Sequence, residues 1–599
     1  MNLRLVLPGV RLIVPCLFLS VLVGQDLRLR KAIDYNPNPR VFETILVAHE
    51  VIHEFQPGVP TRLLAYNGSL PGPTIDAYVG DTLIVHFYNG LREPTTIHWH
   101  GVEMPAVMDG SHIAQPAVPA QGYFRYQFKL NTAATFWYHP HINTNQNIER
   151  GLYGALIVRD HEDDGRLGID PSREFVVFLD EIKLQANGSL SPFGTDPTAS
   201  FTPVRRAEDL ANSRLGNHLV INGHVVSSGD IPTLDVLSGG AYRLRLINVT
   251  SGRVQRLSLT DPEQVWYQLG SDQGFWNDAE RIKPIDKAEN VGHHKGIISN
   301  PDRRLGVTLT PGDRADVVLV PTGNRGDEFY LDFHDYRQGK HIAFWTPMNT
   351  LMFGHEHTDG MLPPKHGIRV RIGSKDKLAG NATWVPPIPL RTRPVLPFKV
   401  DLTQPPLPIF FGHSFPDVKT GDVKFFVNVG NPDGLLKMTR GRMQTTPMMF
   451  MPKPMMMMKA KDGHHVKLGD VHYWEICNFT GGAHNFHTHG FRFQHIDTTY
   501  VDLDAAVKEW TEPARRVAYE DTILIPKRPA LVLSRSYTIV RLAIHFDDRD
   551  RLPALRRTVN EMLAGGLVPT VTTSGGWLLH CHMLEHAAKG MASFVTLTK

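Results

Sequence analysis

Cysteine is scarce in this chain of 599 residues, which contains only Cys16, Cys477 and Cys581. Three cysteines exclude a disulfide framework of the small secreted kind. An excess of charge of one sign is also missing, because 63 basic residues nearly cancel 60 acidic ones and leave a net charge of +3. This balance gives no support for a nucleic-acid partner or for binding an anionic membrane surface. Beyond the N-terminus, no apolar run reaches the roughly 20 residues that span a bilayer.

The N-terminal segment, residues 1–24, resembles a secretory signal peptide. A short basic start at Arg4 is followed by an apolar stretch from Leu12 to Gly24, although Arg11 departs from the pattern. An uncleaved membrane anchor therefore stays an alternative. We expect export to a periplasm or to the outside of the cell, and no integral membrane domain beyond this leader.

Strand-like alternation of apolar and polar residues recurs along the rest of the chain. Residues 83–90 and 242–247 are examples, and 51 glycines and 44 prolines supply frequent turns. Long helical patterns are few. Many short strands separated by turn residues predict an all-β protein built from sandwiches or barrels.

Three segments share one plan, in which a glycine-containing hairpin leads into an alternating strand. They cover residues 78–85, 236–244 and 466–474. Repetition of this kind predicts three copies of one β-domain.

The repeat places domain boundaries near residues 165 and 390. The expected domains cover residues 40–165, 166–390 and 391–599. The second boundary lies in the proline-rich stretch from Trp384 to Pro408, which we expect to form a stiff connector.

The parts of a metal site lie near the C-terminus. His580 and His582 flank Cys581, His586 follows five residues after the cysteine, and Met591 follows ten residues after it. A thiolate, imidazoles and a weak axial thioether form the trigonal site of blue-copper electron-transfer proteins, so copper suits this set better than zinc. The sequence therefore predicts a redox protein. Cys477, by contrast, lies in an alternating run and is interpreted as a buried inert thiol.

Histidine pairs with one intervening residue occur four times. Side chains two apart in a strand project from the same face, so each pair can present two imidazoles to one site. Cys581 then points to the opposite side of its strand from its two neighbours. One such pair alone is weak support for a metal site, but four pairs with a cysteine and a methionine indicate copper. The pairs are His98/His100, His139/His141, His487/His489 and His580/His582.

These motifs give the chain a resemblance to the three-domain multicopper oxidases, the superfamily of laccases, cuprous oxidases and bilirubin oxidases. The resemblance covers nearly everything after residue 40. It implies an all-β fold of three consecutive cupredoxin-like Greek-key β-sandwich or barrel domains. The motifs that carry it, besides the histidine pairs, are residues 67–75, 151–158 and 310–317.

The resemblance implies four copper ions and assigns their ligands. A trinuclear cluster would lie between the first and third domains, and the middle domain, which has no such histidine pair, would be structural. The type 1 copper would be held by His484, Cys581 and His586 with Met591 axial, the type 2 copper by His98 and His487, and the two type 3 coppers by His100, His139, His141, His489, His580 and His582.

The family's reaction passes single electrons from a small-molecule or metal-ion donor to the type 1 copper, and then through Cys581 to the cluster, where dioxygen becomes water. Asp109 matches an acidic residue that helps to deliver protons in the family, although a turn aspartate before glycine is its simpler interpretation. Ala587 replaces a glutamate found after the second type 1 histidine in many relatives, which leaves Glu585 as a candidate proton source. The predicted catalytic residues are Asp109, Cys581 and Glu585.

A methionine-rich segment, residues 438–458, contains 9 of the chain's 18 methionines. Thioethers favour Cu(I), which fits a cuprous oxidase of copper tolerance. An adaptable apolar flap over the type 1 site is the alternative, and we favour this laccase-like interpretation. A copper-sequestering protein with incidental oxidase activity is the rival class, and a copper nitrite reductase ranks last. We expect a monomer.

Overall fold

The structure is a computed structural model, and a defined part of the chain is described. The described residues are 2–7, 10–15, 27–56, 58–194, 214–285, 293–294, 297–298, 305–336, 365–376, 384–404, 406–413, 425–429, 464–478, 480, 482–502, 509–527, 529, 536–547 and 576–598. The methionine-rich segment 438–458 and Cys16 lie outside them. Of the predicted signal peptide, only the antiparallel strands β1 (Asn2–Leu7) and β2 (Val10–Pro15) are described.

Two four-stranded sheets occupy the first third of the chain, in the orders β4-β3-β6-β8 and β5-β10-β9-β7. In β8 (Tyr123–Lys129), burial alternates as the sequence pattern requires, and every second side chain enters the core. Short helices α1 (Thr144–Glu149) and α2 (His161–Leu167) flank the last strand. The other strands are β3 (Val41–Gln56), β4 (Val59–Tyr66), β5 (Gly72–Tyr78), β6 (Thr82–Asn89), β7 (His98–His100), β9 (Ala134–His139) and β10 (Gly154–Arg159).

The middle third contains a seven-stranded sheet, β13-β12-β11-β15-β22-β17-β18, and a five-stranded sheet, β14-β24-β23-β16-β21. Their inner faces bury aliphatic and aromatic side chains in one core. The strands are β11 (Glu174–Ile182), β12 (His218–Ile221), β13 (His224–Val225), β14 (Thr233–Ser238), β15 (Tyr242–Asn248), β16 (Gln255–Leu259), β17 (Val265–Ser271), β18 (Gly274–Arg281), β21 (Val307–Leu309), β22 (Arg314–Val320), β23 (Glu328–Asp335) and β24 (Lys365–Lys375).

The last third contains a six-stranded sheet, β26-β25-β28-β33-β30-β31, and a five-stranded sheet, β27-β35-β34-β29-β32. A short helix, α6 (Leu584–Ala588), follows β34. The strands are β25 (Leu407–His413), β26 (Phe425–Val429), β27 (His464–Lys467), β28 (Val471–Asn478), β29 (His484–Thr488), β30 (Phe493–Asp502), β31 (Glu509–Pro513), β32 (Thr522–Ile525), β33 (Ser536–His545), β34 (Gly576–His580) and β35 (Ala592–Thr598).

The internal repeat corresponds to one structural device, used three times. Gly80, Gly239 and Gly469 all have positive φ, between +84° and +87°, and each lies in the short turn between one strand and the next. The left-handed conformation favours glycine because it has no Cβ. The prediction of a hairpin here was wrong, because the two strands flanking each glycine belong to different sheets of a sandwich. The turn is a corner between sheets.

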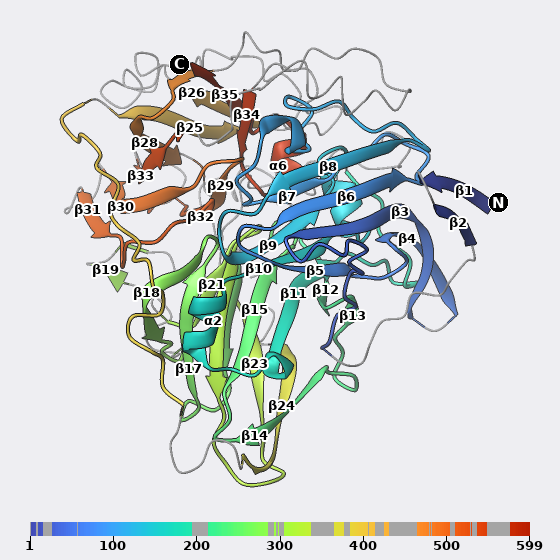
Figure 1. Ribbon diagram of the computed structural model, residues 1–599. Helices are drawn as coiled ribbons and strands as arrows, with labels where there is room; N and C mark the ends of the chain where they lie inside the picture. The colour runs from blue at the N-terminus through green and yellow to red at the C-terminus, as the bar shows by residue number, and fades with distance from the viewer. Residues whose placement is uncertain are drawn as a thin grey trace.

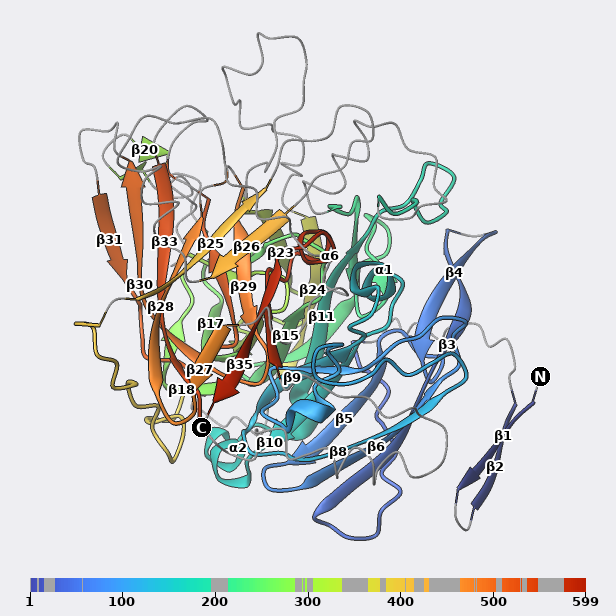
Figure 2. The same ribbon diagram turned by 90° about the horizontal axis from the view of Figure 1, so that it is seen from above.

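The three pairs of sheets form three bodies, which follow one another in colour from blue to red (Figure 1). Among the described strands, no sheet combines strands from two of the expected domains. Viewed from above, the first and last bodies stand side by side (Figure 2). The all-β sandwich fold is confirmed, while the domain boundaries themselves stay predictions.

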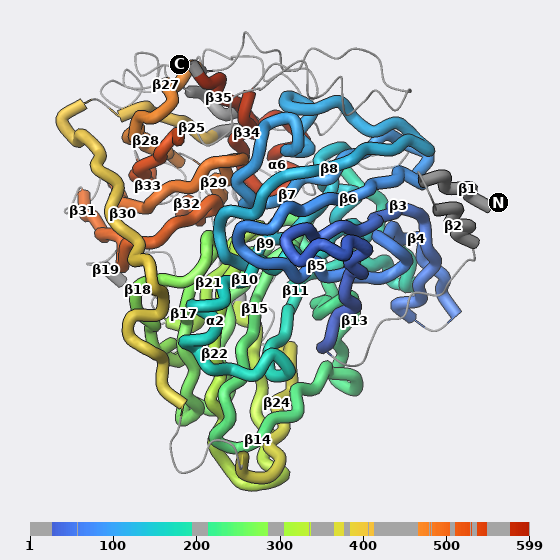
Figure 3. Tube along the Cα trace, in the orientation of Figure 1, coloured from blue at the N-terminus to red at the C-terminus, as the bar shows by residue number. Residues whose placement is uncertain are grey.

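The proline-rich connector contains no strand between residues 384 and 404 and runs as an extended trace along the molecule (Figure 3). It is held against the middle body by a hydrogen bond from its Val395 N to Asn277 Oδ1 at 2.7 Å. Phe398 N then donates to Gln494 Oε1 in the last body at 2.6 Å. The connector therefore links the two bodies by contact as well as by sequence. Within the described part of the chain, no helix is long and apolar enough to cross a membrane.

Candidate metal centre

The histidine pairs meet where the first and last bodies face each other. Strand pairing places His98 of β7 opposite His139 of β9, and His487 of β29 opposite His580 of β34. Across the boundary between the bodies, the rings of His98 and His489 stack with centroids 3.9 Å apart. All eight histidines of the four pairs are at most 1% exposed. Segments nearly 500 residues apart in sequence thus form one buried imidazole cluster.

The local geometry of the pairs differs from the prediction in one respect. Only His98 and His100 both lie within a strand, β7. The other three pairs lie at strand ends, so that the first histidine belongs to the strand and the second follows it. Alternation within a strand therefore does not aim these second histidines. The turns that follow the strands direct these second histidines instead, and the imidazoles still converge on one cluster.

The ring nitrogens of this cluster are arranged as metal ligands. His98 Nδ1 donates to the backbone oxygen of Asp109 at 2.7 Å, and His487 Nδ1 lies 2.8 Å from the backbone oxygen of Asp521. A metal-binding histidine usually engages its second nitrogen in this way, which fixes the ring. Nε2 of both residues has no hydrogen-bond partner among the described residues, although it is buried.

The remaining histidines of the cluster also present nitrogens without partners. These are Nδ1 of His100, Nε2 of His139 and both nitrogens of His141 and His582. His489 Nε2 and His580 Nε2 lie 3.2 Å apart. Unpaired buried polar atoms are costly, so they require an explanation such as an ion. Sets of three nitrogens close enough to share a metal include His98/His487/His489 and His141/His489/His580.

Burial lowers the pKa of most of these imidazoles and so favours the neutral form, which is the form that binds metals. It lowers the pKa of His580 to about 3, and the neighbouring histidine charges act in the same direction. The pKa of His582 is also lowered well below its usual value, first by burial and then by the charge of His100. A protonated imidazole has no lone pair for a metal, so these side chains are prepared as ligands.

The cysteine site lies at the end of β34, because Cys581 directly follows the last residue of that strand, His580. Cys581 Sγ is 3.6 Å from Nδ1 of His484 and 3.6 Å from Nδ1 of His586. Met591 is completely buried, and its backbone oxygen accepts a hydrogen bond from Cys581 N at 3.0 Å. Burial raises the pKa of the Cys581 thiol to about 12, so thiolate ligation requires a metal that displaces the proton. The donor set, two imidazoles and a thiol with a buried thioether, suits copper.

Asn485 is a neighbour of this site that the sequence did not single out. Its Oδ1 lies 3.3 Å from Cys581 Sγ and accepts a hydrogen bond from Met583 N at 3.0 Å. Its Nδ2 donates to the backbone oxygen of Pro311 in the middle body at 2.6 Å. These two hydrogen bonds fix the direction of the amide, so its oxygen is held against the sulfur.

The structure places Asp109 against the imidazole cluster. Its Oδ2 lies 2.9 Å from His489 Nδ1, and its carboxylate is fully buried. Burial raises the pKa of Asp109, but the charge of His98 and the hydrogen bonds from His98 and Ser111 outweigh this effect and lower it overall. An ionised carboxylate on the far nitrogen of a histidine orients the ring and increases its basicity.

Glu585, the other predicted proton source, lies on α6 at the contact with the first body. Its Oε1 accepts a hydrogen bond from Asn145 Nδ2 at 2.8 Å, and the residue is fully buried. Asn145 belongs to α1, four residues after His141. The carboxylate is thereby connected to the loop that carries one histidine pair.

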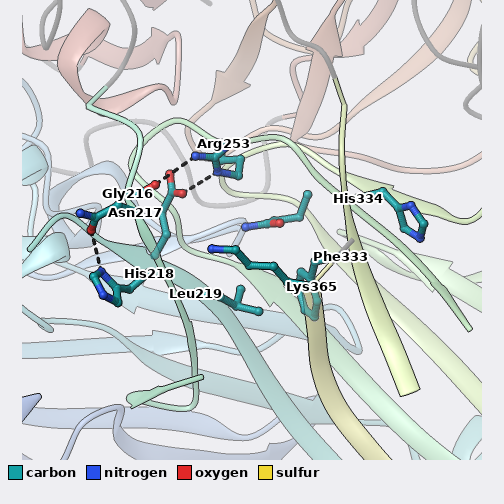
Figure 4. A pocket seen from close by; sticks show the side chains of 10 residues that line it. Gly216, Asn217, His218, Leu219, Arg253, Phe333, His334 and Lys365 are labelled. Atoms are coloured by element: carbon teal, nitrogen blue, oxygen red, sulfur yellow. Dashed lines mark hydrogen bonds and ion pairs between the residues drawn. The ribbon is translucent and has the colours of Figure 1, made fainter. Parts of the chain in front are cut away.

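A small cavity in the middle body lies apart from these residues (Figure 4). It has a volume of about 40 Å³ and is lined by side chains that include His218, Arg253 and Lys365. Arg253 Nε forms an ion pair with Glu181 Oε2 at 2.6 Å. A volume of this size holds a few water molecules, which is too little for an aromatic electron donor.

Sequence and structure comparisons agree with this geometry. Two family models, each described as multicopper oxidase, match residues 48–163 and 430–541. Laccase-2 of Cryptococcus neoformans var. grubii is 39% identical over 285 residues, which cover 46% of this chain and 43% of the laccase. The multicopper oxidase mco of Staphylococcus aureus is 27% identical over 276 residues, or 45% of this chain and 56% of the relative. The chain thus spans about half the length of the curated relatives it matches.

Solved structures share the fold over nearly the whole chain. A multicopper oxidase of Campylobacter jejuni, described as a metallo-oxidase, has a TM-score of 0.64 and 20% identity, and the match covers 95% of this chain and 94% of that chain. A multicopper oxidase of Pediococcus acidilactici gives a TM-score of 0.63 at 22% identity and covers 96% and 91% of the two chains. Family models, relatives and fold agree with the buried histidine and cysteine clusters, and together they indicate a multicopper oxidase.

Proposed function

We propose that the protein is an oxidase that couples one-electron oxidation of a donor to the four-electron reduction of dioxygen to two water molecules. The observation that carries the proposal is the sequence His580-Cys581-His582. Cys581 Sγ faces His484 and His586, while the two flanking histidines enter the imidazole cluster. A thiolate site and a histidine cluster are therefore joined through adjacent residues. This arrangement favours transfer of electrons between two metal sites.

Four copper ions are proposed, with the ligands that the resemblance to multicopper oxidases suggests. Copper would supply one-electron transfer at the cysteine site and multi-electron reduction of dioxygen at the histidine cluster. The proposed ligands are His484, Cys581, His586 and Met591 for type 1 copper, His98 and His487 for type 2 copper, and His100, His139, His141, His489, His580 and His582 for the type 3 pair.

The protein's own residues prepare both sites for this chemistry. The cluster histidines are buried, and burial lowers the pKa of most of them, so few protons compete with a metal there. Asp109 stays ionised beside His489 and accepts its Nδ1–H. Reduction of dioxygen to two waters consumes four protons. We propose Asp109 as the carboxylate that relays them, with Glu585 as a second candidate at the boundary between the first and last bodies.

A phenol or an aromatic amine is the proposed donor, and Cu(I) is the second candidate. The methionine segment 438–458 favours Cu(I), because thioethers bind this ion well. Deletion of residues 443–458 separates the two. The deletion abolishes Cu(I) oxidation if the segment binds that ion, and it only alters phenol oxidation if the segment is an apolar flap. Oxygen consumption with Cu(I) or with a dimethoxyphenol is the measurement.

Copper sequestration is the competing function. Copper storage does not need a cysteine that is joined to a histidine cluster, so the sequence His580-Cys581-His582 supports the proposal of an oxidase. A copper-loaded protein that consumes no oxygen with either donor would favour sequestration. We further propose that the protein is exported and acts as a monomer, and the N-terminal segment supports the first of these proposals.

A further inference from the structure

One turn of the middle body lies against the proposed trinuclear site. The turn connects β21 and β22 and contains Gly312, whose φ is +93°. A Cβ at this glycine would lie 3.0 Å from Cε1 of His100 and 3.3 Å from Cγ of His582. The backbone of the middle body therefore packs directly against imidazoles that come from both other bodies. A purely structural domain would not need so close an approach.

Arg314 follows this turn and is buried, with 1% exposure. Its Nη1 and Nη2 donate to Oδ1 and Oδ2 of Asp521 at 2.7 and 2.5 Å, which is a bidentate pair. Its Nε donates to the backbone oxygen of Thr135 at 3.0 Å, and Nη2 donates to the backbone oxygen of Asp272 at 3.0 Å. One guanidinium thus contacts all three bodies. Because the guanidinium is planar and all three of its nitrogens donate hydrogen bonds, the position of the Arg314 side chain is fixed.

Asp521 connects Arg314 to two histidines of the cluster, His100 and His487. Its Oδ1 lies 3.1 Å from Nε2 of His100 and 3.5 Å from Nδ1 of His487. Gln273 of the middle body donates to Asp521 Oδ2 at 2.5 Å from a further direction. His100 thus faces the carboxylate with Nε2, while its other ring nitrogen, Nδ1, has no hydrogen-bond partner among the described residues. Asp521 therefore holds Nε2 of His100 through its carboxylate and Nδ1 of His487 through its backbone oxygen, which lies 2.8 Å away.

We propose that Arg314, supported by Gln273, is a positioning residue for the trinuclear copper site. Arg314 acts through Asp521, which sets the ring orientation of one proposed type 2 ligand, His487, and one proposed type 3 ligand, His100. The middle body then has a role in oxygen reduction although it supplies no ligand. This inference rests on the proposed oxidase function.

Stability alone is a poor reason for this arrangement. A buried ion pair pays desolvation for both charges, and replacing such a pair by apolar residues is often neutral or stabilising. The same body contains Arg243, a buried arginine that pairs with Asp164 at 2.7 Å and Glu174 at 3.1 Å, away from the histidines. Arg243 is therefore a matched control, because it shares the burial and the ion pairing but none of the contacts to Asp521.

The test compares Arg314→Lys with Arg243→Lys in the full-length, copper-loaded protein. Lysine keeps the charge of Arg314 but loses the bidentate geometry. We expect Arg314→Lys to change the electron paramagnetic resonance spectrum of type 2 copper and to lower oxygen consumption with a dimethoxyphenol by roughly 10- to 100-fold, the usual effect of losing an outer partner of a metal ligand. Type 1 absorption and anaerobic reduction of type 1 copper should stay within twofold of wild type.

The control and a second variant keep the inference falsifiable. Arg243→Lys should lower the thermal unfolding temperature and leave the type 2 spectrum and turnover unchanged. If Arg314→Lys does not fold, Gln273→Met decides, with the same spectral change expected at a smaller loss of turnover. A wild-type spectrum and turnover in Arg314→Lys, or an equal type 2 change in Arg243→Lys, would overturn the inference. Absence of oxygen consumption by the wild-type protein would instead overturn the proposed function.

Discussion

Replacement of the Asp109 carboxylate by an amide tests the link between the first body and the cluster. Asp109 Oδ2 accepts from His489 Nδ1 at 2.9 Å, and both residues are fully buried. A hydrogen bond to a charged group contributes about 1.5–3 kcal/mol, which corresponds to a factor of roughly 10–100 at about 1.4 kcal/mol per tenfold. Asp109→Asn should therefore reduce oxygen consumption by about this factor. The backbone contact of residue 109 with His98 is retained, so copper should still bind.

The assay is oxygen consumption by the copper-loaded variant, with copper content and type 1 absorption measured on the same sample. Asp180→Asn is the control. Asp180 is also a buried aspartate, but burial raises its pKa well above the usual value, which favours the neutral acid that an amide resembles. We expect this control to keep wild-type turnover. Unchanged oxygen reduction in Asp109→Asn at full copper content would refute the assigned role.

Three further predictions concern single residues. Met591→Leu removes the buried thioether that is proposed as the axial ligand, and it should raise the reduction potential of type 1 copper. An unchanged or lower potential in a redox titration would contradict this prediction. Gly312→Ala places a methyl group 3.0 Å from His100 Cε1 at a φ of +93°. This backbone conformation costs an alanine at least about 1–2 kcal/mol. Metal analysis should therefore find less copper in the proposed trinuclear cluster, with type 1 absorption retained. Burial raises the pKa of Glu174, but Arg245 and its neighbours outweigh this and lower it strongly. The ionised carboxylate thus stabilises the fold above about pH 4.3, and this contribution is lost as the pH falls. Glu174→Gln should therefore have a lower unfolding temperature than wild type at pH 7. Its unfolding temperature should also change less than that of wild type as the pH is lowered.

The sequence identified the histidines and the cysteine that cluster in the structure better than it predicted how these residues are held. Cys581 and the histidine pairs could be found because metal ligation needs particular residue types at short, regular spacings. Their convergence could be inferred because four such pairs are difficult to explain separately. The prediction that each pair lies within a strand was correct only for His98 and His100. Strand ends depend on turns and neighbouring sheets, and local spacing does not contain this information.

The residues that orient the ligands were not identified from sequence. Arg314 lies in β22, Asn485 lies in β29, and Asp521 directly precedes β32. They act through contacts between residues that are 34 to 207 positions apart. An aspartate or an arginine in a strand carries no distinguishing spacing, so only the packed structure reveals its role. Residues 310–317 did carry a signal, because they belonged to the family resemblance. The middle domain that contains this segment was expected to be structural, whereas the structure places Gly312 of this segment against His100 and His582.

The measurement that tests the account most directly is the copper content and oxygen stoichiometry of the purified protein. The account predicts four copper ions per chain, a type 1 absorption that Cys581→Ser abolishes, and four electrons taken from a dimethoxyphenol for each dioxygen consumed. A protein that binds copper but consumes no oxygen with either a dimethoxyphenol or Cu(I), or that keeps its type 1 absorption in Cys581→Ser, would contradict it.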